Sequence, residues 1–148
     1  MTPEQRGLRD ALAAVPGRLV AAVVTSPVAP DDAPEPGEWS AREVVLHLAA
    51  VEEEVWHARL DALAKETFPR WQWVEPGLWS GPGDATFDGA LRAYTERRAA
   101  TLARLDALEP AGWTRTGRHD VYGVLDVAAM LRILIDHDEE HLAQLGRG

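Results

Sequence analysis

The sequence predicts an all-α fold, a four-helix bundle with long connections, from two observations. Apolar residues recur at three- and four-residue intervals in four stretches, and no stretch shows the apolar–polar alternation of a half-buried strand. The connections between these stretches are long and partly rich in proline and glycine, unlike the short loops of an up-and-down bundle. Because 148 residues suffice for one hydrophobic core, we expect residues 1–148 to form a single domain.

The first two helices are predicted from apolar stripes and a capping signal. The stripe from Leu8 to Val23 keeps its phase across a proline, which indicates one kinked helix. A stretch with four prolines follows, and then Ser40 and Glu43 form a capping box. We expect the second helix to run from Ser40 to about Glu66, with the glutamates at 52–54 mostly facing water.

The other two helices lie in the second half of the chain. The third is expected at 87–108, where Glu109-Pro110 ends it, and the fourth at 126–145, with Asp126 as N-cap and Gly146 as stop. The connection from Thr67 to Ala85 contains three tryptophans. Its length is typical of a lid, a binding loop or an interface, although the tryptophans could equally plug one end of the bundle.

Composition restricts the function. The chain has 15 basic and 24 acidic residues, a net charge of -9, and no local basic patch, which argues against nucleic-acid binding. No apolar run is long enough to cross a bilayer and the start lacks a secretion signal, so we expect a soluble cytoplasmic protein. The chain has no cysteine, so any thiol chemistry would need an external thiol.

Three histidines are candidate metal ligands. His137 and His141 are four residues apart and continue an inward-facing stripe of the fourth helix, so both imidazoles can reach one ion. His47 lies on the inward face of the second helix. A shared divalent ion would satisfy three buried imidazoles at once, whereas the alternative for the C-terminal pair is a hydrogen-bonded or exposed arrangement.

The remaining histidines are weaker candidates. His57 lies about 80° from His47 around the helix, which favours a surface or boundary position over metal ligation. His119 lies in a loop, where a structural hydrogen bond is more common than a place at the mouth of a site. Glu54 and Asp138 each precede a histidine by three residues, as in di-iron bundles, but the third helix offers only Glu96, off its inward stripe.

Three further residues are weak catalytic candidates on helical phase alone. Arg98 interrupts the apolar stripe of the third helix, where a buried guanidinium needs an anionic partner. It could pair with a neighbouring carboxylate, extend its stem outward to water, or anchor an anionic substrate. Gln144 shares the face of His137, and Glu54 shares that of His47. Either could orient a bound nucleophile or a metal ligand.

Two stretches, WSAREVVLHLAAVE and RHDVYGVLDVAAMLRILIDHDEEHLAQL, carry a family resemblance. With the arginine-bearing third helix between them, they resemble the DinB-like (DinB/YfiT-like) superfamily of bacterial metal-binding four-helix bundles. The resemblance implies one divalent ion, often zinc or nickel, held by three histidines that carry over onto His47, His137 and His141. It also implies crossover topology and a frequent homodimer.

Characterised relatives in this family include transferases that use bacillithiol or mycothiol, and a mycothiol-dependent isomerase. This chain departs from the isomerase, because no second domain follows the bundle. We therefore expect a thiol transferase acting on small electrophiles in stress response or detoxification. A metal-dependent hydrolase and a non-catalytic, metal-stabilised dimerising bundle stay open as alternatives.

Overall fold

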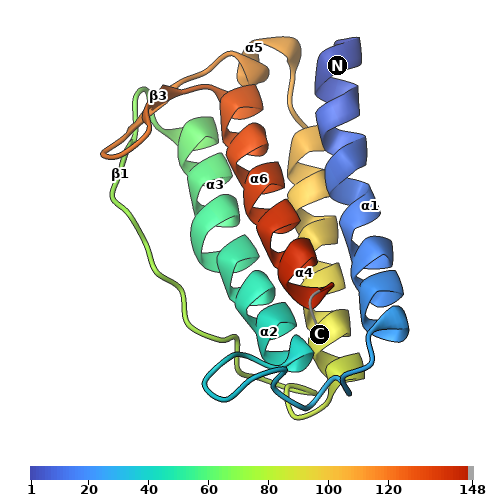
Figure 1. Ribbon diagram of the computed structural model, residues 1–148. Helices are drawn as coiled ribbons and strands as arrows, with labels where there is room; N and C mark the ends of the chain where they lie inside the picture. Colours follow the sequence, from blue (N-terminus) through green and yellow to red (C-terminus); the bar gives the residue numbers. More distant parts are fainter. Residues whose placement is uncertain (147–148) are drawn as a thin grey trace.

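The computed structural model of the chain describes residues 1–146 and consists of four long helices with a small sheet at one end (Figure 1). The helical elements are α1 (Pro3–Thr25), α2 (Ala41–Val51), η1 (Glu52–His57), α3 (Ala58–Lys65), α4 (Phe87–Asp106), α5 (Pro110–Trp113) and α6 (Val127–Leu145). Because α2, η1 and α3 follow one another without a break, they form one long helix, and the predicted four-helix bundle is confirmed.

The predicted helix starts are present as hydrogen-bonded caps. The Ser40 hydroxyl accepts from the backbone N–H of Glu43 at 3.2 Å, and the Glu43 carboxylate accepts from the N–H of Ser40 at 3.1 Å. Asp126 likewise accepts from the N–H of Ala129 at 2.8 Å and begins α6. α1 passes through Pro16 as one helix, as its continuous apolar stripe predicts.

The bundle has a crossover. In Figure 1 the helix formed by α2, η1 and α3 runs in the same direction as α4, and the connection between α3 and α4 returns along the outside of the bundle. α1 packs against α4 and α6, and α2 packs against α4. Apolar side chains from all four long helices fill the core, among them Leu12, Leu19, Leu48, Tyr94, Leu105, Met130 and Leu134.

The second long helix is not a regular α-helix throughout. Its middle, η1, is π-helical, with wider turns than the flanking α-helical segments. Glu53 and Glu54 are exposed, as expected for most of this run. Glu52 is the exception: 1% of its surface is exposed, and its carboxylate pairs with Arg98 in the core.

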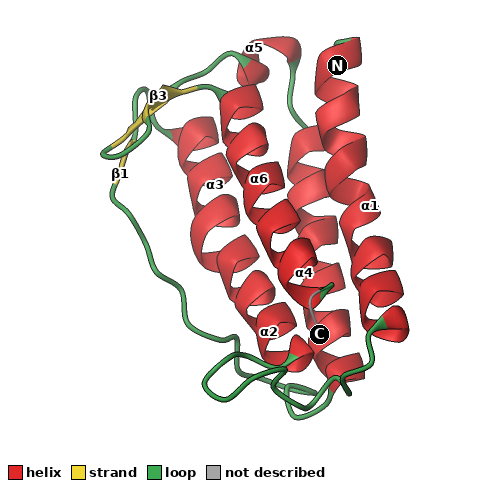
Figure 2. Cartoon of the chain, viewed as in Figure 1, coloured by secondary structure: helices red, strands yellow, loops and turns green. Residues whose placement is uncertain are grey.

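A three-stranded sheet, which the sequence did not predict, lies at one end of the bundle (Figure 2). β1 (Arg70–Trp71) pairs in parallel with β2 (Gly117–His119), and β2 pairs antiparallel with β3 (Gly123–Leu125). Strands of two or three residues are too short for apolar–polar alternation to show. The sheet joins the tryptophan-containing connection to the loop of His119. No helix among residues 1–146 has both the length and the apolar character needed to cross a membrane.

Candidate metal centre

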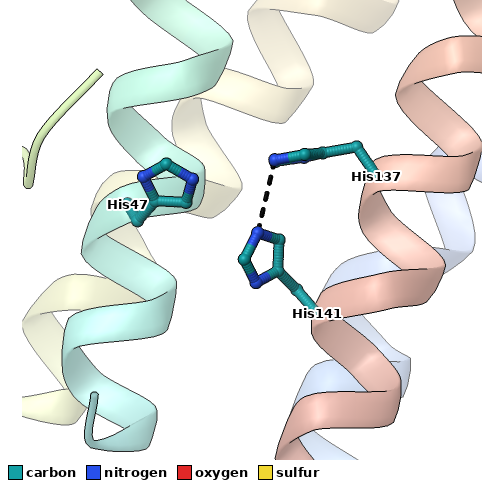
Figure 3. A group of neighbouring side chains, drawn as sticks. All are labelled: His47, His137 and His141. Atoms are coloured by element: carbon teal, nitrogen blue, oxygen red, sulfur yellow. Dashed lines mark hydrogen bonds between the residues drawn. The ribbon is translucent and has the colours of Figure 1, made fainter. Parts of the chain in front are cut away.

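Three imidazoles from two helices meet in the bundle. His47 extends from α2, and His137 and His141 extend from α6 (Figure 3). One ring nitrogen from each of the three lies within 4.8 Å of the other two. The ring centroid of His47 is 5.7 Å from that of His137 and 5.2 Å from that of His141. Residues 90 positions apart in the sequence therefore form one cluster, as predicted for a metal site.

Hydrogen bonds orient two of the three rings. The Nδ1 of His141 lies 2.9 Å from the side-chain oxygen of Gln144, and the Nδ1 of His47 lies 3.3 Å from the carbonyl oxygen of Gly77. Because these oxygens only accept hydrogen bonds, Nδ1 is the protonated nitrogen in both rings. The lone pair is then on Nε2, and one nitrogen of His47 faces the α6 pair in Figure 3.

Burial keeps the α6 pair neutral. Burial, together with the neighbouring imidazoles and Arg98, lowers the pKa of His137 to about 4. Burial also lowers the pKa of His141, against the opposing effect of its hydrogen bond to Gln144. Only neutral imidazole can bind a metal ion, so both rings are in the ligand form near pH 7.

The spacing of the pair suits a shared ion. The two Nε2 atoms are 3.3 Å apart, and two nitrogens bound to one tetrahedral zinc at about 2.0–2.1 Å are also about 3.3 Å apart. His47 lies slightly further away, so ligation would draw its ring toward the pair. The Nδ1 of His137 is buried without a hydrogen-bond partner among the described residues. The three residues therefore fit a divalent ion.

A cavity of about 460 Å³ adjoins the cluster, a size typical of small-molecule sites. Its lining residues come from the second long helix, the tryptophan-containing connection, the sheet loop and α6: His47, Val51, Val55, Trp56, Arg59, Trp73, Val74, Glu75, Pro76, His119, Tyr122, Ile133, Asp136, His137 and Glu140. The connection is held on α2 by a hydrogen bond from the N–H of Trp79 to the carbonyl oxygen of Leu46 (3.1 Å). It therefore forms part of the cavity wall and does more than plug the bundle.

Arg98 lies outside the cavity lining and is fully paired in the core. Its guanidinium contacts the carboxylate of Glu52, donates to both carboxylate oxygens of Asp138 at 2.9 and 3.1 Å, and donates to the carbonyl oxygen of Leu12 at 2.9 Å. Burial lowers its pKa, but the nearby carboxylates outweigh burial and raise the pKa overall. The carboxylate partner considered from the sequence is therefore observed, and the guanidinium does not reach the cavity where a substrate would bind.

Of the other candidate residues, Gln144 contacts the histidine cluster, whereas Glu54 and Asp138 do not. Gln144 contacts the metal-ligand candidate His141, as described above, which matches an orienting role. Glu54 is exposed and does not line the cavity, because the π-helical segment carries it away from the face of His47. Asp138 is paired with Arg98, so the pattern shared with di-iron bundles supplies no carboxylate to the three-histidine cluster within residues 1–146.

The two remaining histidines are both buried. His57 lies 2.9 Å from the carbonyl oxygen of Arg97 and 2.9 Å from the hydroxyl of Thr101, away from the cluster. His57 is thus not part of the cluster, as expected, but it is buried, whereas a surface or boundary position was expected. His119 makes a structural hydrogen bond and also lines the cavity, so both alternatives considered for it apply. Sequence reasoning missed Arg59 altogether, since an arginine after the glutamates resembles an ordinary exposed charge.

Comparisons with known proteins agree with this architecture. Residues 11–145 match the DinB superfamily. The solved structure of YfiT from Bacillus subtilis is similar with a TM-score of 0.74 at 22% sequence identity, over 99% of this chain and 89% of that one. YfiT is described as a probable metal-dependent hydrolase with an unusual four-helix bundle topology. No curated protein gives a significant match. Because the family match spans nearly all of the described residues, the chain belongs to the DinB superfamily.

Proposed function

We propose that this protein is a metal-dependent transferase that joins a low-molecular-weight thiol, of the mycothiol or bacillithiol type, to a small electrophile. His47, His137 and His141 hold the divalent ion, and zinc or nickel suits three imidazole ligands. The observation that carries the proposal is the convergence of three ring nitrogens at the edge of a cavity of about 460 Å³. A closed structural site would be expected to have a fourth protein ligand, and none of the described residues adds one to the cluster.

The lining of the cavity favours a thiol over water as the nucleophile. When bound, the ion would lower the pKa of a coordinated thiol or water and so supply a nucleophile near pH 7. Hydrolysis usually also needs a general base beside the water. The carboxylates that line the cavity belong to Glu75, Asp136 and Glu140, which are exposed residues at its rim. A thiol needs less help, because metal coordination alone deprotonates it.

The proposed reaction with a chlorinated aromatic acceptor balances without a redox partner. The thiol sulfur forms a bond to the ring carbon that carries chlorine, the carbon–chlorine bond breaks, and chloride leaves with the electron pair. The thiol proton goes to solvent. The residues of the chain bind both reactants in the cavity and exclude bulk water from them, which brings the sulfur and the carbon together.

A metal-dependent hydrolase is the second candidate, and the description of YfiT favours it. The two candidates differ in one requirement, because a hydrolase turns over without thiol. Purified protein loaded with zinc or nickel is incubated with mycothiol, bacillithiol or cysteine and 1-chloro-2,4-dinitrobenzene, and conjugate is measured by absorbance and mass spectrometry. A parallel series omits the thiol and supplies ester and amide substrates.

We expect thiol conjugate from the wild type, and a loss of about 100-fold or more in His47→Ala and His141→Ala. The matched control is Arg18→Met, which alters an exposed residue outside the cavity and should leave the rate unchanged. Absence of conjugate with every thiol would refute the transferase, and thiol-independent turnover would establish the hydrolase instead. A metal-loaded protein inactive in both series would leave the non-catalytic bundle as the remaining explanation.

A further inference from the structure

Arg59 is a buried cation without a carboxylate partner. Only 6% of its surface is exposed, yet none of the ion pairs among residues 1–146 involves it. Its guanidinium makes one long hydrogen bond, 3.4 Å to the carbonyl oxygen of Gln72, and lies 5.3 Å from the ring centre of Trp56. Burial lowers the pKa of Arg59, which is the cost of a charge without a partner. Arg98, in contrast, is surrounded by carboxylates.

His119 presents a second donor without a partner. Its Nδ1 accepts from the backbone N–H groups of Val121 at 2.9 Å and Tyr122 at 3.2 Å, so the proton of the neutral ring is on Nε2. Burial lowers the pKa of His119, and Arg59 lowers it further, which keeps the ring neutral. The Nε2–H is buried and has no hydrogen-bond partner among the described residues. A buried donor left unpaired is costly unless a ligand accepts from it.

Both residues line the same cavity as the metal-ligand candidates His47 and His137. The cavity is also lined by the aromatic side chains of Trp56, Trp73 and Tyr122, and the buried N–H of Trp56 has no hydrogen-bond partner within residues 1–146. Aromatic walls bind apolar ligand bodies, and a few fixed polar groups orient them. An elongated ligand could therefore contact the three-histidine cluster with one end and these donors with the other.

We infer that Arg59 and His119 form a carboxylate-binding site, and that the cavity takes a small molecule with a carboxylate and an apolar or aromatic body. This inference rests on the proposed function, for which it names the substrate class. The planar guanidinium can donate two parallel hydrogen bonds to a carboxylate, and the Nε2–H of His119 can supply a third. The carboxylate that binds at this site belongs either to the electrophile or to the thiol.

Direct binding tests the inference without turnover. Full-length protein freed of metal by a chelator is titrated with 3-phenylpropionate and with its neutral amide at pH 7.5, and tryptophan fluorescence is measured. Metal is removed because a carboxylate could otherwise coordinate the ion itself. Two further acid–amide pairs separate the sources: N-acetylcysteine for the thiol and 4-chloro-3-nitrobenzoate for the electrophile. The pair with the larger preference identifies the natural position of the carboxylate.

We expect the wild type to bind at least one acid about tenfold or more tightly than its amide, as for hydrogen bonds to charged groups. Arg59→Met should abolish the preference, and Arg59→Lys should retain part of it. His119→Asn, which can still accept from the loop amides but has no Nε2–H, should reduce it. Arg18→Met, an exposed arginine outside the cavity, is the matched control and should keep it.

The comparison of acid and amide affinities in the wild type needs no variant. It therefore tests the carboxylate-binding site even if Arg59→Met fails to fold. Equal affinity for acid and amide in all three pairs would overturn the inference, as would a full preference in folded Arg59→Met. A preference that appears only in metal-loaded protein would also overturn it, since the ion would then be the binding group. If the preference is present but no thiol is transferred, the carboxylate site stands and the proposed transferase fails.

Discussion

At the scale of single residues, the hydrogen bonds of the imidazoles matter as much as their positions. The Nδ1 atoms of His47 and His141 are held by oxygen acceptors, which leaves Nε2 as the ligand atom of each ring. Such contacts to metal-binding histidines fix the tautomer and orientation of the ring before the ion arrives. Gln144, a candidate from helical phase, contacts His141 and is placed to orient its ring.

Replacing Gln144 should weaken metal binding without removing a ligand. Gln144→Leu leaves the Nδ1–H of His141 without its acceptor, so we expect metal affinity to fall by about 10- to 100-fold. Gln144→Glu keeps an acceptor at the same position and should bind at least as well as the wild type. Competition with a chromophoric chelator measures both affinities. An unchanged affinity in Gln144→Leu would show that this hydrogen bond does not orient the ligand.

The neutral state of His137 should make metal-free protein sensitive to acid. Its pKa is about 4 in the folded state and near the ordinary 6.5 in the unfolded chain, so the unfolded chain binds more protons between these values. The contribution of His137 to stability is present above pH 6.5 and is lost as the pH falls toward 4. Urea unfolding of the metal-free wild type and His137→Gln at pH 7.5 and pH 5 measures it.

The variant should lose less stability between the two pH values than the wild type. Asp138, whose pKa is raised to about 7 by burial, contributes with the opposite sign: its stabilisation increases as the pH falls. It is present in both proteins, so the difference between them isolates His137. An equal loss in wild type and variant would mean that His137 titrates normally in the fold.

At the scale of elements, the π-helical segment η1 keeps residues of the second long helix on the face that lines the cavity. His47, Val51, Val55 and Arg59 all line the cavity, at intervals of four residues. In a regular α-helix each such step drifts by about 40°, so the three steps from His47 to Arg59 would add up to about 120° and the four residues would not share one face. The wider turns of η1 compensate for this drift. Caps and stripes predicted the helices, but nothing in EEEVWH distinguishes π-helical from α-helical turns.

Among the contacts between elements, the sequence predicted the histidine cluster but not the proximity of Arg59 and His119. The trio of histidines could be predicted because each lies on the inward face of a helix whose phase is readable near its caps. Arg59 and His119 could not, because their meeting depends on η1 and on strands of two and three residues. Arg98 was predicted to be buried from its place in an apolar stripe, although its two carboxylate partners come from different helices.

The ion cluster of Arg98 should be important for stability because it joins elements. Arg98 contacts the carbonyl oxygen of Leu12 in α1, Glu52 in η1 and Asp138 in α6. Arg98→Met would leave two buried carboxylates without a counter-charge, and we expect a loss of about 3–5 kcal/mol in the free energy of unfolding. Urea denaturation at pH 7.5 measures this loss.

The exposed pair of Arg18 and Glu139 provides the control, because about half of each side chain is accessible to water. Arg18→Met should cost less than about 1 kcal/mol in the same assay. If Arg98→Met lost no more than this control, the buried cluster would be structurally dispensable. A protein too unstable to purify would agree with the expected loss, and Arg98→Lys, which keeps the charge, should then recover part of the stability.

At the scale of the whole molecule, the crossover brings α2 and α6 together around the three histidines. The connection that makes the crossover possible also passes beside the cluster, where Gly77 contacts His47 and Trp73 lines the cavity. Topology and site are thus linked: the long connection that returns the chain to the start of α4 also forms a wall of the binding cavity.

The most direct test of this account is the metal content of protein purified without added metal, measured by elemental analysis in the wild type and in His47→Ala. His47 is distant in sequence from the α6 pair, so its effect reports the convergence itself. We expect about one divalent ion per chain in the wild type and a loss of most of it in His47→Ala, with the helical circular dichroism spectrum unchanged. Full metal content in folded His47→Ala, or none in the wild type even after incubation with zinc and nickel, would contradict a three-histidine metal centre.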